Sequence, residues 1–222
     1  MEPQSLFGLV CEGPSDQLIL RYLLGYWYKN LSLDINELQP LEGEYGGWSK
    51  VIAYCGSEEF RDAFAFVQYL IIQIDTDVSE EKGFDVSKRK QDGTERSIAE
   101  LREAIKARLI QAIGEDFYEE FQDRIFFAIS IHEMECWLLP FFATPTKKYV
   151  NKKMGCLDTL NRAYLTPKLG FSIDPVEKQV KYYQKLLRFK QLKKALKKQE
   201  LYQNQLSLDL FVRSLPELSH PP

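Results

Sequence analysis

The sequence predicts an α/β fold built on a mainly parallel sheet, and three observations support this fold class. Three apolar runs, residues 6–11, 69–74 and 125–131, have the length of buried strands. Segments with helical periodicity separate these runs along the chain. Strands that alternate with helices usually pair in parallel through right-handed crossovers. We therefore expect one sheet flanked by helices.

The other elements are expected in chain order. A helix begins at Pro14-Ser15-Asp16 and ends near Lys29, with an apolar stripe wide enough to pack on a sheet. Residues 37–41 form a short strand, which Pro40 places at an edge. Ser49 is the expected N-cap of the next helix, and residues 79–94 form a long polar loop. Further helices are expected over residues 50–54, 57–67, 95–116, 157–164, 176–201 and 206–215.

Charge is distributed unevenly along the chain. The net charge is −3, but residues 147–222 hold sixteen Lys and Arg against six Asp and Glu. A basic segment beside an acidic body suits a metal-dependent enzyme that acts on phosphodiesters, because one part attracts the polyanion and the other holds cations. A solvated helix face produces the same pattern without any such role.

Composition limits the location of the chain and the kind of metal site. No apolar run approaches the roughly 18 to 20 residues of a membrane span, and the N-terminus lacks the basic flank and apolar core of a signal peptide. We expect a cytoplasmic protein without membrane contact.

Two histidines are too few for a histidine-built site, so carboxylates would bind any metal, which favours Mg²⁺ or Mn²⁺ over zinc. Four scattered cysteines are expected to be buried free thiols: Cys11, Cys55, Cys136 and Cys156.

Acidic residues follow each of the three predicted strands. Glu12 follows the first strand, Asp75 and Asp77 end the second, and Glu133 and Glu135 follow the third. Because parallel strands direct their carboxyl ends to one edge of the sheet, we expect these acids to gather there. Crowded carboxylates repel one another unless a cation neutralises them. The sequence therefore predicts a divalent metal site at this edge.

Two spacings refine this prediction. Asp75 and Asp77 are two residues apart, so in an extended strand their side chains would point the same way. Asp16 lies four residues after Glu12, near the start of the first helix. It is either a second metal ligand or an acid favoured by the helix dipole.

Two motifs together resemble the Toprim domain. Val10-Cys-Glu12-Gly13 follows a strand and precedes a helix, and Ile74-Asp75-Thr-Asp77 ends a second strand. In the Toprim family a glutamate and an Asp-x-Asp pair at these places bind magnesium and act on phosphodiester bonds. The resemblance implies a Toprim-like, Rossmann-like catalytic domain over residues 1–145, followed by a basic, mostly helical extension over residues 146–222.

Two finer features resemble particular branches of that family. Glu12-Gly-Pro-Ser-Asp16 is similar to a motif of the overcoming-lysogenization-defect nucleases and of small stand-alone bacterial Toprim proteins, in which the second acid also binds metal. Ile131-His-Glu-Met-Glu135-Cys-Trp resembles a segment of the stand-alone proteins in which an acid precedes Ala-Trp. That alignment places the acid on Glu135, with Glu133 as the substitute.

The resemblance implies a metal-dependent nuclease that hydrolyses DNA or RNA with one or two Mg²⁺ (or Mn²⁺) ions. Glu12, Asp75, Asp77 and Glu135 would be catalytic, and these four would share the metal with Asp16 and Glu133. Glu12 acts instead as a general acid/base in Toprim enzymes that cut and rejoin. The resemblance also implies a role in bacterial anti-phage defence, with a separate ATPase as partner, because this chain lacks a Gly-x-x-x-x-Gly-Lys-Ser/Thr loop.

Two other functions remain open at this point. The chain is alternatively a nucleotidyl transferase, or a non-catalytic module that binds nucleic acid or a partner and uses its acids for a structural metal. Tyr182, Tyr183 and Phe189 lie among the lysines of the tail and either stack on bases or belong to the core. The candidate phosphate contacts are Lys147, Lys148, Lys152, Lys153, Lys181, Lys185 and Arg188.

Overall fold

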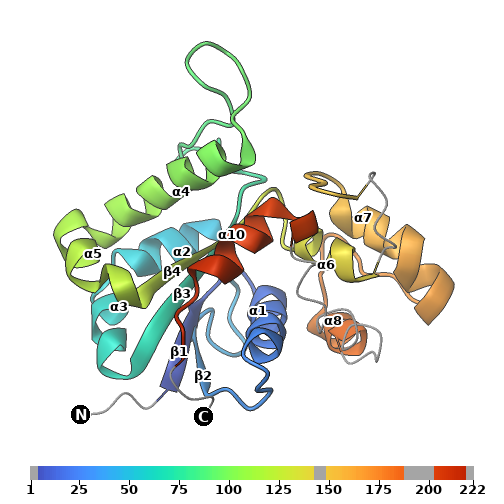
Figure 1. Cartoon of the computed structure of the whole chain (residues 1–222), viewed down its shortest axis with the longest axis horizontal. Coiled ribbons are helices and arrows are strands. Elements are labelled where there is room, and N and C mark those ends of the chain that lie inside the picture. Colours follow the sequence, from blue (N-terminus) through green and yellow to red (C-terminus); the bar gives the residue numbers. More distant parts are fainter. Residues whose placement is uncertain (1–4, 143–148, 188–202, 219–222) are drawn as a thin grey trace. The chain divides into compact units, whose positions relative to one another are not determined.

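The computed structural model of the chain describes residues 5–142, 149–187 and 203–218 (Figure 1). Contacts divide the chain into two packing units, which we call the first unit (1–14 and 34–131) and the second unit (15–33 and 132–222). The domain boundary predicted between residues 145 and 146 lies outside the described residues and stays a prediction.

The described part of the first unit contains a four-stranded, all-parallel sheet with the strand order β2-β1-β3-β4 (Figure 1). This arrangement confirms the predicted α/β fold. The three predicted apolar strands are β1, β3 and β4, and the predicted edge strand is β2, which ends just before Pro40. The bounds are β1 (Ser5–Val10), β2 (Ile35–Gln39), β3 (Val67–Asp75) and β4 (Ile125–Ser130).

The strand order creates a switch point between β1 and β3. From β1 the chain crosses to β2 on one side, and from β2 it returns to β3 on the other side of β1. Register pairs Leu9 with Ile71 and Val10 with Ile72, so β1 ends three residues before the end of β3. In open α/β sheets ligands bind outside the carboxyl ends of the strands at such a point.

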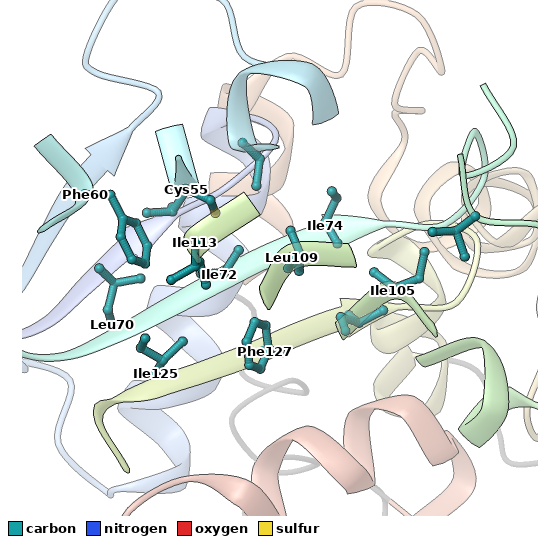
Figure 2. Packing of buried hydrophobic residues seen from close by; sticks show 14 of the residues in the cluster. Cys55, Phe60, Leu70, Ile72, Ile74, Ile105, Leu109, Ile113, Ile125 and Phe127 are labelled. Atoms are coloured by element: carbon teal, nitrogen blue, oxygen red, sulfur yellow. The ribbon is translucent and has the colours of Figure 1, made fainter. Parts of the chain in front are cut away.

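One face of this sheet packs against the helices of the first unit. Leu70 and Ile72 of β3 and Phe127 of β4 alternate along their strands and point to this face. Ile105 and Leu109 of α4 meet them there (Figure 2). The helices of this unit are α2 (Trp48–Cys55), α3 (Glu58–Asp62), α4 (Ile98–Ile113) and α5 (Glu115–Phe121), with 3-10 turns at Ala63–Ala65 and Gln122–Arg124.

Helix starts differ slightly from the predicted ones. Ser97 and Glu100 form a reciprocal capping box, so α4 begins at Ile98 and not at Glu95. The predicted N-cap Ser49 is wrong, because Gly47 occupies the N-cap position of α2.

The predicted long loop over residues 79–94 contains no helix, but it is anchored to the first unit. Phe84 is fully buried, and its ring stacks on Trp48 with 5.3 Å between ring centroids. Arg108 of α4 donates hydrogen bonds to the carbonyls of Gly83 (2.8 Å) and Phe84 (3.2 Å). Phe84, the buried Val86 and the hydrogen bonds of Arg108 therefore hold a mostly polar loop.

The second unit is helical in its described residues. Trp137 stacks on Phe211 with 5.4 Å between ring centroids and donates a 2.8 Å hydrogen bond to Ser207. The predicted helix over 176–201 begins at Val180, and residues 188–202 lie outside the described residues. Among the helices that the structure describes, none has the length and apolar character needed to cross a membrane. The helices of this unit are α1 (Pro14–Trp27), α6 (Glu135–Phe142), α7 (Cys156–Leu160) with its π-helical continuation Asn161–Leu169, α8 (Val180–Leu187) and α10 (Leu206–Ser214).

Cysteine pairing differs from the prediction. Cys136 of α6 and Cys156 of α7 form a disulfide, so the expectation of free thiols is wrong for these two. Cys11 and Cys55 are buried free thiols, as predicted. The sequence separation of 20 residues gives no pairing signal, because the packing of α6 against α7 brings the two cysteines together.

Candidate metal centre

Glu12 and Asp75 meet at the switch point of the sheet. Glu12 comes two residues after the end of β1, and Asp75 is the last residue of the neighbouring strand β3. The backbone N–H of Asp75 donates a 2.6 Å hydrogen bond to Oε1 of Glu12. The structure therefore brings together two of the acids that the sequence singled out.

Two polar residues inside the strands orient these acids. The side-chain amide of Gln73 accepts a hydrogen bond from the Glu12 N–H (3.0 Å) and donates one to Oδ1 of Asp75 (2.9 Å). The hydroxyl of Ser130, at the end of β4, donates to the same Oδ1. Sequence reasoning missed both residues. The available signal was a glutamine between two isoleucines and a serine inside the apolar run 125–131, because buried polar side chains need partners.

A turn from outside the sheet fixes the backbone of Glu12. The N–H of Gly47 donates a 2.6 Å hydrogen bond to the carbonyl of Glu12. A β-carbon added at Gly46 would lie 1.7 Å from that carbonyl oxygen. Position 46 therefore has room only for glycine while this turn stays in place.

Asp77 differs from Asp75 in its surroundings. Asp75 is 7% exposed, whereas Asp77 is exposed. Strand β3 ends at Asp75, so the alternation rule that predicted parallel side chains does not extend to Asp77. Oδ1 of Asp77 accepts a 2.9 Å hydrogen bond from the N–H of Val78, and Lys88 Nζ donates to the Asp77 carbonyl.

Glu135 belongs to the second unit and is fully buried. Lys178 Nζ lies 3.1 and 3.2 Å from its two carboxylate oxygens, and the hydroxyl of Tyr183 also donates to it. Burial raises the pKa of Tyr183 well above its ordinary value, and the charge of Glu135 raises it further. Tyr183 therefore keeps its proton and acts as a hydrogen-bond donor inside this unit.

Glu133 and Asp16 also belong to the second unit. Oε1 of Glu133 accepts hydrogen bonds from the N–H groups of Cys156 (2.7 Å) and Leu157 (3.0 Å), so this acid caps α7. Asp16 is buried in the first turn of α1, and its charge contributes to the raised pKa of Tyr183. That Asp16, Glu133 and Glu135 share one metal with Glu12 and Asp75 stays a prediction.

The donors at the sheet edge suit a hard cation. Mg²⁺ usually binds one or two carboxylates and completes its shell with water and substrate phosphates. Glu12 and Asp75, with the exposed Asp77 beyond them, match this requirement in chemistry. Within the described residues, one group of three side chains has its possible ligand atoms close together. That group does not include the acids of the sheet edge; its members are Glu133, Cys136 and Cys156.

The candidate phosphate contacts are described only in part. Lys147, Lys148, Arg188 and Phe189 lie outside the described residues. Lys152 is half-buried, and Lys153, Lys181 and Lys185 are exposed.

The described aromatic residues of the tail divide between surface and core. The ammonium groups of Lys181 and Lys185 lie 5.0 and 5.6 Å from the ring centre of Tyr182, which itself stacks on Phe171. Tyr183 is fully buried and belongs to the core, so the alternative of base stacking is wrong for this residue. Tyr182 is the partly exposed aromatic residue of α8 that accompanies the lysines.

The Toprim resemblance rests on the motifs quoted above. Comparisons of the chain with protein-family models, with curated proteins and with solved structures find no significant match.

Proposed function

We propose that this chain is a Mg²⁺-dependent nuclease of the Toprim type that hydrolyses phosphodiester bonds in DNA or RNA. The observation that carries the proposal is the hydrogen bond from the Asp75 backbone to Glu12, which joins the carboxyl ends of β1 and β3 at the switch point. A carboxylate pair at this place in an open parallel sheet is well suited to hold a cation for a ligand.

The residues of the site have distinct tasks in this proposal. Glu12 and Asp75 hold the cation, and Asp77 binds it from the exposed turn. Gln73 and Ser130 keep the Asp75 carboxylate in one orientation, because both donate to its Oδ1. A Mg²⁺ ion held by these residues would polarise the scissile phosphate and lower the pKa of a water. Asp16, Glu133 and Glu135 are the remaining candidate ligands, and Glu135 would have to share its charge between the metal and Lys178.

The proposal extends to partners by resemblance to the overcoming-lysogenization-defect nucleases. The chain would act in the cytoplasm, in anti-phage defence, together with a separate ATPase. Exposed lysines on α8, with Tyr182 between Lys181 and Lys185, support contact with a polyanion. Mn²⁺ would replace Mg²⁺ at the same oxygen ligands.

A cleavage assay tests the proposal. Plasmid DNA, single-stranded DNA and RNA are incubated with the purified chain in Mg²⁺, Mn²⁺ or a chelator. We expect cleavage only with metal, and its fall to background in Asp75→Ala/Asp77→Ala. A matched control, Glu119→Ala/Glu120→Ala, removes two exposed acids of α5 and should cleave like wild type.

One outcome would contradict the nuclease proposal. If wild type and Asp75→Ala/Asp77→Ala were equally inert with every substrate and metal but bound nucleic acid equally well, the non-catalytic module would be the better description. The assay is repeated with lysate of the native host, so that a missing ATPase partner is supplied.

A further inference from the structure

The second unit holds two sulfurs and a carboxylate in one place. The ligand atoms of Glu133, Cys136 and Cys156 all lie within 4.8 Å of one another. Both cysteines are fully buried, and Glu133 is half-buried. This group belongs to the second unit, whereas Glu12 and Asp75 belong to the first unit.

Hydrogen bonds as well as the disulfide hold the three groups in position. The side-chain amide of Gln205 donates to the carbonyl of Cys136 (3.2 Å) and to the carbonyl of Lys152 (3.1 Å). This buried amide ties the start of α6 to the segment that precedes α7. Glu133 is oriented by the N–H groups of Cys156 and Leu157, which donate to its Oε1. The α-carbons of the two cysteines are 4.9 Å apart, so with this backbone the thiols of the reduced chain would be neighbours.

Two thiolates and a carboxylate form a ligand set of a known chemical kind. Zinc prefers thiolate sulfur at about 2.3 Å and carboxylate oxygen at about 2.0–2.2 Å, and sites with three protein ligands keep a fourth position for water. Magnesium, by contrast, binds oxygen ligands and has little affinity for thiolate. In reducing compartments, paired cysteines are more often metal ligands or catalytic groups than structural disulfides.

We propose that the reduced chain binds Zn²⁺ through Glu133, Cys136 and Cys156, and that formation of the disulfide abolishes this site. The proposal goes beyond the nuclease function and does not depend on it. The two sulfurs cannot form the disulfide and bind Zn²⁺ at the same time, because each sulfur bonds either to the other sulfur or to the metal. The site would therefore bind Zn²⁺ only where the surroundings keep both cysteines reduced.

The redox step balances with a dithiol as reductant. One thiolate of the dithiol attacks a sulfur of the Cys136–Cys156 bond, forms a mixed disulfide and releases the other cysteine as a thiolate. The second thiolate of the dithiol then displaces the remaining cysteine, so the reductant leaves as a cyclic disulfide. The two cysteine thiolates take up the two protons that the dithiol loses, and Zn²⁺ binding releases those protons again.

Cobalt spectroscopy tests the proposal without reference to nuclease activity. The full chain is reduced with dithiothreitol, freed of it by anaerobic desalting, and titrated with Co²⁺. We expect one Co²⁺ per chain with thiolate-to-metal charge-transfer bands and tetrahedral visible bands, which Zn²⁺ then bleaches. The oxidised wild type should show neither set of bands. Co²⁺ at the carboxylate centre gives no thiolate bands, so Asp75→Ala/Asp77→Ala should retain the full signal whether or not the nuclease proposal holds.

Variants assign the ligands. Cys136→Ser and Cys156→Ser should lose the charge-transfer bands, and Glu133→Gln should bind Co²⁺ more than about tenfold more weakly, since even the loss of an outer partner of a ligand has an effect of this size. Cys55→Ala is the matched control, because burial raises the pKa of the Cys55 thiol to about 12 and its side chain lies in the first unit. Far-UV circular dichroism checks that each variant is folded.

The decisive comparison needs no variant. Equal Co²⁺ spectra for the reduced and oxidised wild type, or no thiolate bands in the reduced wild type, would overturn the proposal. Unchanged bands in Cys136→Ser or Cys156→Ser, or an undiminished Co²⁺ affinity in Glu133→Gln, would remove that residue from the ligand set and overturn the three-ligand site.

Discussion

Asp75 and Glu135 are both buried acids close to the end of an apolar strand, yet they have different neighbours. Asp75 is 7% exposed and accepts hydrogen bonds from an amide and a hydroxyl, those of Gln73 and Ser130. Glu135 is 0% exposed and is bound by the ammonium group of Lys178 and the hydroxyl of Tyr183. Gln73 and Ser130 are neutral donors to Asp75, whereas Lys178 brings a positive charge to Glu135.

From this difference we expect the two acids to have separate tasks. At the sheet edge an oriented carboxylate beside Glu12 suits a cation that arrives with a ligand. In the second unit an ion pair and a tyrosine hydroxyl satisfy Glu135 within the protein itself. We therefore expect substitutions around Glu135 to change stability, and substitutions at the sheet edge to change metal binding.

The largest effect on stability is expected from Lys178→Met. This change leaves the Glu135 carboxylate fully buried without its ion-pair partner, and breaking such a pair typically costs about 3 kcal/mol or more. Urea unfolding followed by circular dichroism measures the free energy of unfolding. Lys181→Met, at an exposed position of α8, is the control and should stay within about 0.5 kcal/mol of wild type. Equal stability of the two variants would mean that the ion pair does not stabilise the fold.

A smaller loss is expected from Tyr183→Phe. The variant loses one hydrogen bond to a charged acceptor, which is worth about 1.5–3 kcal/mol. Tyr182→Phe removes a hydroxyl from the partly exposed neighbour and should change the free energy of unfolding by less than about 0.5 kcal/mol. The same urea titration compares the two variants. A larger loss in Tyr182→Phe would contradict the assigned role of Tyr183.

Asp77→Asn should leave the free energy of unfolding within about 0.5 kcal/mol of wild type, because the side chain is exposed. If the nuclease proposal holds, the same change weakens Mg²⁺ binding, which isothermal titration calorimetry measures. Glu81→Gln alters an exposed acid of the same loop and should bind Mg²⁺ like wild type. Undiminished Mg²⁺ affinity in Asp77→Asn would remove this residue from the candidate centre.

Glu100 extends the comparison to a carboxylate in solvent. Hydrogen bonds from Lys90 and from the Ser97 backbone lower the pKa of Glu100 from 4.5 to about 2. A pKa lowered by folding contributes stability at neutral pH, and that contribution is lost as the pH falls from about 4.5 to about 2. An NMR titration of the Glu100 side chain should give a midpoint near 2, and Lys90→Met should move it toward 4.5. An unchanged midpoint in Lys90→Met would assign the shift to the helix cap alone.

Most of the fold and part of the candidate centre could be predicted from local sequence patterns. The strands and the acids at their ends could be predicted because an apolar run and the residue after it are adjacent in sequence. Glu12 and Asp75 meet because β1 and β3 are neighbours, and the strand order that makes them so cannot be read from a single sequence. The role of Gln73 depends on the same pairing, since its amide bonds to Glu12, 61 positions away, and to Asp75, two positions away.

In the second unit, tertiary packing sets the partners of the acids and cysteines, and the sequence does not reveal these partners. Glu133 caps a helix that begins 23 residues later, and Glu135 pairs with a lysine 43 residues away. No periodicity connects residues at such separations. The Cys136–Cys156 pair went unpredicted for the same reason.

The close approach of Gly46 to Glu12 has a consequence for saturation mutagenesis. Every amino acid other than glycine would place a β-carbon 1.7 Å from the carbonyl oxygen of Glu12, far inside the contact distance of any atom pair. A library scored for function should therefore reject substitutions at position 46 as strictly as substitutions at Glu12. Gly46 would then be among the positions of the chain that tolerate substitution least, and the reason would be steric, not chemical.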